Sequence, residues 1–532
     1  MEADGRSDDA SASTDAPAPL SAYDILAALS TAATDQTVVL HALQSLATEI
    51  KSATQTALEV DAFLCRMLDD KVPVIDVRSP GEFEQGHIPG AVSLPLFSDH
   101  ERSVVGTIYK HQGREAAMIQ GMRYVAPKLD ELVARARELS HDADGAIGVH
   151  CWRGGMRSGA VAWLLRQRGL KAHALAGGYK AFRAWAMASW GDIAMPVPKA
   201  KQRKEKKAKK GAPTKAAVPA EPPAAAAATA GCDTPTDAPA AGAPAHIPVD
   251  TPNESLIGGL PASLVTVAQS WPGRRVCVIG GRTGVGKTRV LLALRRKGHQ
   301  VIDLEGLAAH RGSAFGWVGQ AWHGRAPSDA PDQPTTEHFG NLLALAWRAA
   351  NQAGAHPSTG GRGWLFLEDE DTHIGGATLP AALYAMLRCA PLIVRVHIGE
   401  AARIALLIED YASPQSRGED EAAWLERMED SVLRLGKRIG GAEVNALQGA
   451  LRAREYAGVA RRLIAYYDKL YDAHVLNGSG SGSGTGTRPG AVLEAAQPDE
   501  LPELDAELIA RLVLQRVDEF DVSEAAAAAS IS

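Results

Sequence analysis

Two stretches of the chain alternate short apolar runs with segments of helical spacing. The first extends over 74–185, and the second starts with the apolar strand 275–279, which ends in a glycine-rich turn. Further apolar runs follow at 301–302 and 364–367, and 400–475 has almost wholly helical spacing. Such alternation is typical of parallel α/β units. The pattern therefore predicts two α/β domains, the second with a helical C-terminal part.

The segments outside these stretches differ in composition. Residues 23–64 have helical apolar spacing, whereas the Lys, Pro and Ala of the segment between the domains indicate a disordered linker. A Gly/Ser/Thr tether at 478–486 precedes one more predicted helix at 501–520. We expect five parts: a low-complexity and helical N-terminal extension over 1–60, a first domain over 61–195, the linker over 196–252, a second domain over 253–477, and a flexible tether with a C-terminal helix over 478–532.

Composition limits the classes of protein that fit. The length of 532 residues suits two cores, and the net charge of −6 excludes a uniformly basic nucleic-acid binder. The five cysteines are scattered, with no C-x2-C pair to hold zinc, which favours a reducing compartment. We read no secretory signal, and no apolar run approaches the roughly 20 residues of a membrane helix. A cytoplasmic protein without membrane contact is expected.

Cys151 follows directly after a predicted buried strand, and a predicted helix starts at Ser158. A turn that curls over a helix N-terminus directs backbone N–H groups at a thiolate or a tetrahedral oxyanion and stabilises it. Glycines permit the curl, and arginines add positive charge that favours the reactive thiolate. We therefore predict Cys151 as the catalytic nucleophile. The residues predicted to form its stabilising loop are Arg153, Gly154, Gly155, Arg157 and Ser158.

The segment from Gly281 to Thr288 matches G-x4-G-K-[ST] directly after a strand and directly before a helix. Backbone N–H groups of such a loop surround phosphates, the lysine reaches their outer oxygens, and the hydroxyl binds magnesium. The predicted phosphate-binding residues are Gly281, Gly284, Gly286, Lys287 and Thr288. The cargo is either a nucleotide, whose identity stays open, or an isoprenyl diphosphate.

Polar residues follow two later strands of the same domain. The acidic group at 368–371 either supplies a magnesium ligand or forms a solvated turn. In the first case Mg²⁺ would be held by Thr288 and by Glu368 or Asp369. After the strand at 301–302, His310 and Arg311 stand where α/β domains place ligand loops, so we predict that they contact substrate phosphate or RNA, with simple packing of the loop as the alternative.

The surroundings of Cys151 resemble a rhodanese domain. The stretch IDVRSPGEFEQGHIPGA resembles the first half of that domain, and Gly177 to Tyr179 resembles its closing loop. The spacing Cys151-x5-Arg157 also fits cysteine phosphatases, because a loop wide enough for phosphate also holds a similar anion. Asp76 and Arg78 are interpreted as a structural ion pair.

The two domains together resemble the tRNA 2-selenouridine synthase family. The most telling stretches are VGTIYKHQGREAA and DLEGLAAHRGSAFG, supported by HCWRGGMRSG, GGRTGVGKT, LEDEDTHIG, RLGKRIGG and LIAYYDKLY. The resemblance implies a rhodanese-like domain followed by a P-loop NTPase-like domain. It implies an enzyme that replaces the sulfur of wobble 2-thiouridine in tRNA with selenium from selenophosphate, through a geranylated thiouridine made from geranyl diphosphate. Implied partners are that tRNA and a supplier of selenophosphate.

The resemblance also assigns tasks to the two loops. Cys151 would assist removal of the geranylthio group or handle the selenium donor, and the segment from Gly281 to Thr288 would bind the diphosphate. The sequence departs from the family at 371–373, in the long linker, before residue 60 and beyond 478. Basic residues of the linker and of 434–462 are candidates for RNA contact, with solvated faces as the alternative.

Two other functions remain open at this stage. One is a sulfurtransferase or cysteine phosphatase with a regulatory P-loop, and the other is a non-enzymatic tRNA-binding adaptor. The choice of tRNA, the availability of selenium and the oligomeric state are not specified by the sequence.

Overall fold

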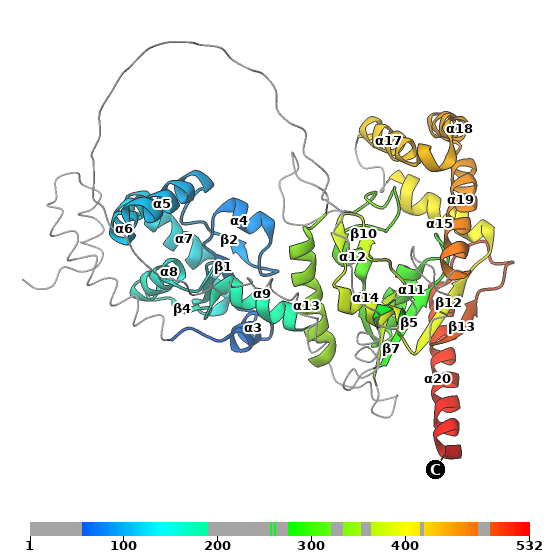
Figure 1. Cartoon of the computed structure of the whole chain (residues 1–532), viewed down its shortest axis with the longest axis horizontal. Coiled ribbons are helices and arrows are strands. Elements are labelled where there is room, and N and C mark those ends of the chain that lie inside the picture. The colour runs from blue at the N-terminus through cyan, green and yellow to red at the C-terminus, as the bar shows by residue number, and fades with distance from the viewer. Residues whose placement is uncertain are drawn as a thin grey trace, which may run out of the picture.

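Parallel strands form the centre of both predicted domains. The computed structural model describes residues 56–189, 256–257, 260–261, 275–320, 333–352, 363–414, 420–476 and 490–531. The linker and nearly all of the N-terminal extension lie outside these residues. The two α/β units lie side by side, with helix α9 (Gly178–Ala188) of the first against helix α13 (Thr336–Gln352) of the second (Figure 1).

Four parallel strands form the first sheet in the order β2-β1-β3-β4. They are β1 (Val74–Asp76), β2 (Val92–Ser93), β3 (Ala146–His150) and β4 (Lys171–Ala174). The other helices are α3 (Val60–Leu68), α4 (Pro80–Gln85), α5 (Asp99–Gln112), α6 (Arg114–Val125), α7 (Leu129–Leu139) and α8 (Met156–Gln167), with short 3-10 turns at Ala126–Lys128 and His141–Ala143. The register pairs Asp76 with His150, so the residues that follow β1 and β3 are neighbours at the carboxyl edge of the sheet.

The second sheet has five parallel strands in the order β13-β12-β7-β9-β8. They are β7 (Arg275–Gly280), β8 (Gln300–Ile302), β9 (Trp364–Glu368), β12 (Leu392–His397) and β13 (Ala491–Ala496). Helices α11 (Lys287–Arg296), α12 (Leu304–Ala308), α13, α14 (Ala381–Arg388) and α20 (Ala506–Ile531) accompany them, with the short antiparallel pairs β5 (Leu256–Ile257) with β6 (Leu260–Pro261) and β10 (His373–Ile374) with β11 (Ala377–Thr378). The central strand β7 leads into the phosphate loop, which lies at the edge where open α/β sheets bind ligands.

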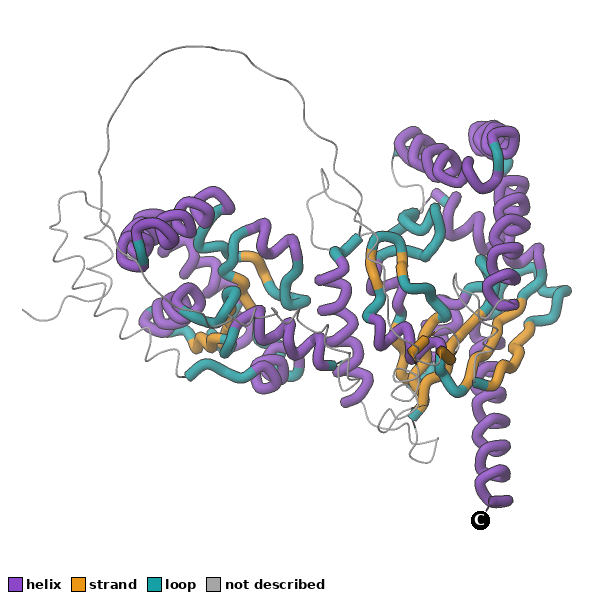
Figure 2. The backbone as a smooth tube through the Cα atoms, in the orientation of Figure 1, coloured by secondary structure: helices purple, strands orange, loops and turns teal. Residues whose placement is uncertain are grey.

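The predicted helical part consists of α15 (Glu400–Ala412), α17 (Glu421–Ile439), α18 (Gly441–Arg452) and α19 (Tyr456–Leu476). It has a hydrophobic core of its own, which includes Trp424, Val432 and Leu447. Figures 1 and 2 place α17 and α18 farther from the sheet than α15. The fold therefore has the predicted class: a rhodanese-like α/β domain followed by a parallel P-loop domain with a helical C-terminal part.

The end of the chain differs from the sequence expectation. We expected only a tether and a helix after residue 478, but residues 491–496 form the edge strand β13, and the helix extends over Ala506–Ile531. The strand was missed because its burial comes from distant parts of the chain: β13 pairs with β12, and α20 packs Ile509 and Val513 into the core beside α11. The Gly/Ser/Thr tether itself lies outside the described residues.

Candidate active site

Cys151 lies at the carboxyl end of β3, where the prediction placed it. Its side chain is 3% exposed, and its Sγ atom is 3.2 Å from the Oγ atom of Ser158 in the first turn of α8. The helix starts at Met156, two residues earlier than expected. Cys151 and Ser158 are therefore brought together as predicted, with the loop 152–155 between them.

Two glycine loops interlock around the thiol. Gly154 has a φ of +61° and Gly178 a φ of +59°, and a Cβ atom at either position would collide with backbone of the other loop. The N–H of Tyr179 donates to the carbonyl of Cys151 at 2.8 Å, and the N–H of Lys180 donates to the carbonyl of Trp152 at 2.9 Å. The closing loop of the domain thus fixes the backbone of the cysteine loop.

The two predicted arginines have different surroundings. Arg153 is exposed, whereas Arg157 donates to Glu82 at 3.2 Å. Burial opposes ionisation of Glu82, but its hydrogen bond to Arg102 and the charge of Arg157 hold its pKa below the ordinary value. Glu82 also forms a capping box with Ser79 at the start of α4. Arg157 is therefore oriented by the Glu82 carboxylate.

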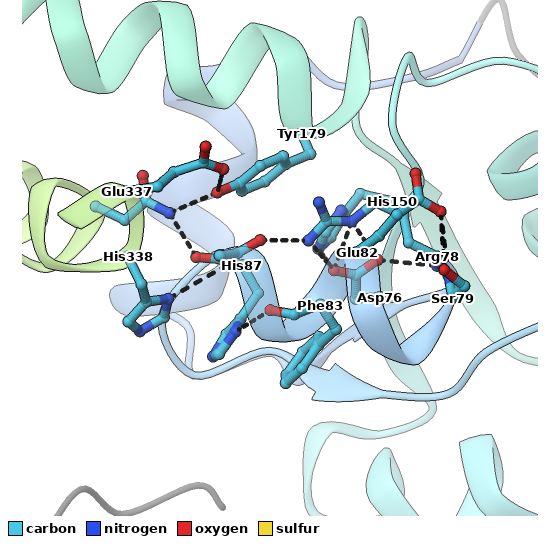
Figure 3. Close-up of polar contacts among 12 residues, drawn as sticks. Asp76, Arg78, Ser79, Glu82, Phe83, His87, His150, Tyr179, Glu337 and His338 are labelled. Atoms are coloured by element: carbon cyan, nitrogen blue, oxygen red, sulfur yellow. Dashed lines mark hydrogen bonds and ion pairs between the residues drawn. The ribbon is translucent and has the colours of Figure 1, made fainter. Parts of the chain in front are cut away.

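A buried ion pair lies behind the loop, in agreement with the structural interpretation of Asp76 and Arg78. The Arg78 Nη2 atom is 2.6 Å from Asp76 Oδ2, and both side chains are at most 1% exposed. The guanidinium also donates to the Gly86 carbonyl at 2.7 Å and lies 3.9 Å from the ring centroid of Tyr179 (Figure 3). Burial lowers the pKa of the adjacent His150 to about 4, so this ring is neutral at pH 7.

The phosphate loop connects β7 to α11 as predicted. Gly281, Gly284 and Gly286 all have positive φ, and the side chain of Lys287 folds back so that Nζ donates to the Gly281 carbonyl at 3.4 Å. Burial opposes the charge of Lys287, but Glu305, Glu370 and Glu368 raise its pKa. The lysine is therefore charged inside the loop that is to receive phosphate.

The carboxylate that contacts Thr288 is neither of the two alternatives, Glu368 and Asp369, that the sequence suggested. The Thr288 hydroxyl donates to Glu305 at 3.0 Å, while Asp369 is 2.5 Å from the guanidinium of Arg388. Glu368 is fully buried and accepts from the N–H groups of Leu304 and Glu305 at 2.8 and 3.2 Å. Glu305 was missed because it lies after a different strand, and only the fold brings it to Thr288.

Three glutamates are crowded at this point. Burial raises the pKa of Glu305, and burial together with the charge of Glu305 raises the pKa of Glu368 and of Glu370 well above the ordinary value. Within the described part of the chain, no three His, Cys, Asp or Glu side chains are arranged to hold a metal ion by themselves.

His310 and Arg311 make contacts within the protein. His310 Nδ1 accepts from the N–H of Gly312 at 3.1 Å, and Arg311 donates to the Asp410 carbonyl at 3.1 Å with its guanidinium 5.3 Å from the ring centroid of Tyr411. These contacts attach the loop after α12 to α15. The predicted contact of both residues with phosphate or RNA stays a prediction.

The two domains meet close to the cysteine loop. The hydroxyl of Tyr179 donates to Glu337 of α13 at 2.7 Å and accepts from the side-chain amide of Asn341 at 2.9 Å. The N–H of His87 donates to Nδ1 of His338 at 3.3 Å (Figure 3). Burial lowers the pKa of His338 to about 3, so it is neutral here. These interdomain contacts join residues that are far apart in the sequence, so no local sequence pattern indicated them.

The remaining described cysteines lack such surroundings. Cys277 is fully buried in β7 and burial raises its pKa, and burial also raises the pKa of Cys389. Cys65 is exposed and accepts from Arg348 at 3.1 Å. Cys232 lies outside the described residues. Trp152, next to the nucleophile, was not singled out from the sequence, yet it is 38% exposed and presents an aromatic surface beside Cys151.

These sites define a two-domain α/β protein in which a rhodanese-type cysteine loop is joined to a P-loop. The family model of the rhodanese-like domain matches residues 60–184, and that of the tRNA 2-selenouridine synthase AAA domain matches residues 274–488. Over most of its length the chain is similar to proteins named tRNA 2-selenouridine synthase, and the second of these models carries the same family name.

Three relatives that bear the name tRNA 2-selenouridine synthase match most of the chain. The protein of Marinobacter nauticus is 28% identical, with 79% of this chain and 93% of the relative covered. Those of Sulfurovum sp. and Pseudomonas putida are each 29% identical, with 76% of this chain and 89% and 87% of the relatives covered. Among the described residues, no helix is both long and apolar enough to cross a membrane.

Proposed function

We propose that this chain is a tRNA 2-selenouridine synthase, which replaces the sulfur of wobble 2-thiouridine with selenium from selenophosphate through a geranylated intermediate. The observation that carries the proposal is the presence of a cysteine loop and a phosphate loop in one chain whose relatives bear this name. The relatives do not favour the phosphatase, sulfurtransferase or adaptor alternatives.

Cys151 is the proposed nucleophile of the selenium step. Its thiol lies at the N-terminus of α8, within hydrogen-bonding distance of Ser158, where backbone N–H groups and the helix dipole favour an anion. Arg157, held by Glu82, adds positive charge at the same place. Such a loop suits a phosphate-sized anion, so selenophosphate or the departing geranylthio group would meet the thiol here.

The proposed cargo of the phosphate loop is geranyl diphosphate, with Lys287 on its outer oxygens. The crowded glutamates support a magnesium ion between loop and diphosphate, because Glu305, Glu368 and Glu370 would otherwise repel the anion. Among the described residues, the Oε1 atom of Glu368 is buried without a hydrogen-bond partner. Thr288 and Glu305, with Glu368 behind them, are the residues that would hold the cation, whose positive charge would stabilise the leaving diphosphate.

Trp152 is proposed to receive the uridine base. Proteins commonly hold unpaired RNA bases by stacking them on exposed aromatic rings. The ring of Trp152 is attached directly beside Cys151, and its centroid lies 5.8 Å from that of Tyr179, which keeps the loop rigid. A base stacked on Trp152 would have its C2 substituent near the thiol.

The proposal is tested by mass spectrometry of nucleosides from 2-thiouridine-containing tRNA incubated with the protein, geranyl diphosphate and selenophosphate. The wild-type chain should produce 2-selenouridine. The Cys151→Ser variant should accumulate geranylated thiouridine, and the Lys287→Ala variant should form neither product. Thiouridine that stays unchanged under all conditions would reject the proposed function.

A further inference from the structure

An apolar cavity that is partly open to solvent adjoins the phosphate loop. The loop contributes Thr283, and the four helices of the C-terminal part contribute most of the wall, including Leu407, Trp424, Met428 and Ile464. The cavity thus lies beside the predicted phosphate site and shares side chains such as Trp424 and Met428 with the core of the helical part.

The cavity wall and the phosphate loop are built as one unit. A Cβ atom at Gly284 would lie 3.0 Å from the side chain of Leu407, so helix α15 lies directly against the loop. Arg403 of the same helix donates to the Thr283 carbonyl at 2.7 Å and is held at 2.6 Å by Asp468 of α19. A ligand with phosphates in the loop would therefore have its remaining part directed along this wall.

The lining favours a hydrocarbon over a nucleoside. Most lining side chains are aliphatic or aromatic, and burial raises the pKa of both Tyr411 and Tyr467 to about 12, so that they stay neutral. The Tyr467 hydroxyl already accepts from the N–H of Ala314 at 3.4 Å. A ribose or base placed here would leave polar groups without partners, which is unfavourable, whereas a hydrocarbon chain would not.

Helix α17 contributes Trp424 and Met428 to the cavity wall. Trp424 and Met428 lie one turn apart on this helix and are 3% and 5% exposed. Figure 1 shows α17 on the side of the helical part away from the sheet, whereas α15 is the helix that contacts the loop. A chain that enters at Thr283 would therefore end against the side chains of α17.

We propose that this cavity holds the hydrocarbon chain of a prenyl diphosphate, and that Met428 and Trp424 limit the length of that chain. This inference rests on the proposed function, because it takes the diphosphate to occupy the phosphate loop. It assigns chain-length specificity to the helical part of the protein and phosphate binding to the sheet edge.

The test compares binding of inorganic, geranyl and farnesyl diphosphate to the full-length protein by calorimetry. The Met428→Ala variant lengthens the cavity, so its affinity for farnesyl relative to geranyl diphosphate should rise by about tenfold, a usual effect of fitting extra methylene groups. The Ala460→Phe variant fills the cavity, so it should bind geranyl diphosphate about tenfold more weakly while its affinity for inorganic diphosphate changes by less than about twofold.

Met386→Ala is the matched control. Met386 is a methionine of α14 that is 2% exposed, and it packs in a different hydrophobic core, with Trp347 and Leu383, away from the cavity wall. It should leave the farnesyl-to-geranyl ratio unchanged. Thermal unfolding verifies that each variant is folded, and Ile464→Phe replaces Ala460→Phe if the latter does not fold. The inference would be overturned if Met428→Ala changed the affinities for geranyl and farnesyl diphosphate equally. It would also be overturned if Ala460→Phe weakened the binding of inorganic and geranyl diphosphate equally. Because no tRNA is present, this result is distinct from a failure to form 2-selenouridine.

Discussion

The Tyr179 hydroxyl donates a hydrogen bond of 2.7 Å to Glu337, and the N–H of the same tyrosine donates to the carbonyl of Cys151 at 2.8 Å. A single residue therefore links the nucleophile's loop to helix α13 of the P-loop domain. Asn341 of α13 donates to the same hydroxyl, so the Tyr179 hydroxyl has two hydrogen-bond partners on α13. The position of the cysteine loop thereby depends on the P-loop domain.

Removing this hydroxyl should weaken the link. In Tyr179→Phe, the buried Asn341 and the half-buried Glu337 each lose a hydrogen-bond partner, so we expect a loss of about 1–3 kcal/mol in stability of the domain contact. The selenium step should slow more than diphosphate binding, because only the cysteine loop is displaced. Thermal unfolding and single-turnover assays measure the two effects. Tyr109→Phe, at a tyrosine that is 60% exposed, is the control and should change neither.

Ser158→Ala should reduce the reactivity of Cys151. The hydroxyl lies 3.2 Å from Sγ and is fully buried, so its loss removes a hydrogen-bonding partner of the thiolate. We expect the rate of alkylation by iodoacetamide at Cys151 to fall by about tenfold, equivalent to about 1.4 kcal/mol. Ser140→Ala removes an equally buried hydroxyl, which bonds to the Ala136 carbonyl, and should leave this rate unaffected. Equal rates in the wild type and Ser158→Ala would exclude the role of Ser158.

Glu305→Gln should change the dependence of diphosphate binding on magnesium. With Mg²⁺ present, loss of a carboxylate ligand should weaken binding by about tenfold. Without Mg²⁺, binding should be unchanged or tighter, because the group of crowded glutamates has lost one ionisable carboxyl. Calorimetry with and without Mg²⁺ measures whether the affinity for diphosphate rises or falls in each case. Asp371→Asn alters an exposed acidic residue and should show neither. Weaker binding in both conditions would contradict the magnesium site.

Trp152→Ala should raise the KM for tRNA without affecting diphosphate binding. Stacking of a base on an aromatic ring contributes about 1–3 kcal/mol, which corresponds to roughly 5- to 150-fold. Trp152→Phe keeps an aromatic surface and should restore most of the loss. Steady-state kinetics with tRNA measure the KM, and calorimetry measures the affinity for geranyl diphosphate. If Phe and Ala behave alike, the ring is not a stacking surface.

Lowering the pH should destabilise the fold through its buried histidines. His338, with its pKa lowered to about 3 by burial, stays neutral in the fold, while the unfolded chain takes up a proton near the ordinary value of 6.5. Between these values the unfolded state binds more protons, so stability falls as the pH falls, by up to about 1.4 kcal/mol per pH unit for such a group. Denaturant unfolding from pH 7.5 to 5 should show this slope. In His338→Gln the slope should be smaller.

The sequence was most informative where the chemistry is local. Cys151 and Ser158 are seven residues apart, and the residues from Gly281 to Thr288 are consecutive, so strand, turn and helix signals were enough to place them. Contacts between distant segments were not predictable in the same way. Glu305 reaches Thr288 only through the order of strands β7, β9 and β8, and Glu337 reaches Tyr179 only through packing of two domains.

The position of β13 has a consequence for synthesis of the protein. The first domain, whose described residues end at 189, is complete long before the ribosome reaches residue 491, and domains generally fold as units from the N-terminus. The second sheet is different, because its edge strand is made of residues 491–496 and the covering helix of 506–531. The phosphate loop therefore has its complete support only after residues 491–531 have been translated. During that interval the edge of β12 is exposed, and an unpaired strand edge of this kind is a site where aggregation begins.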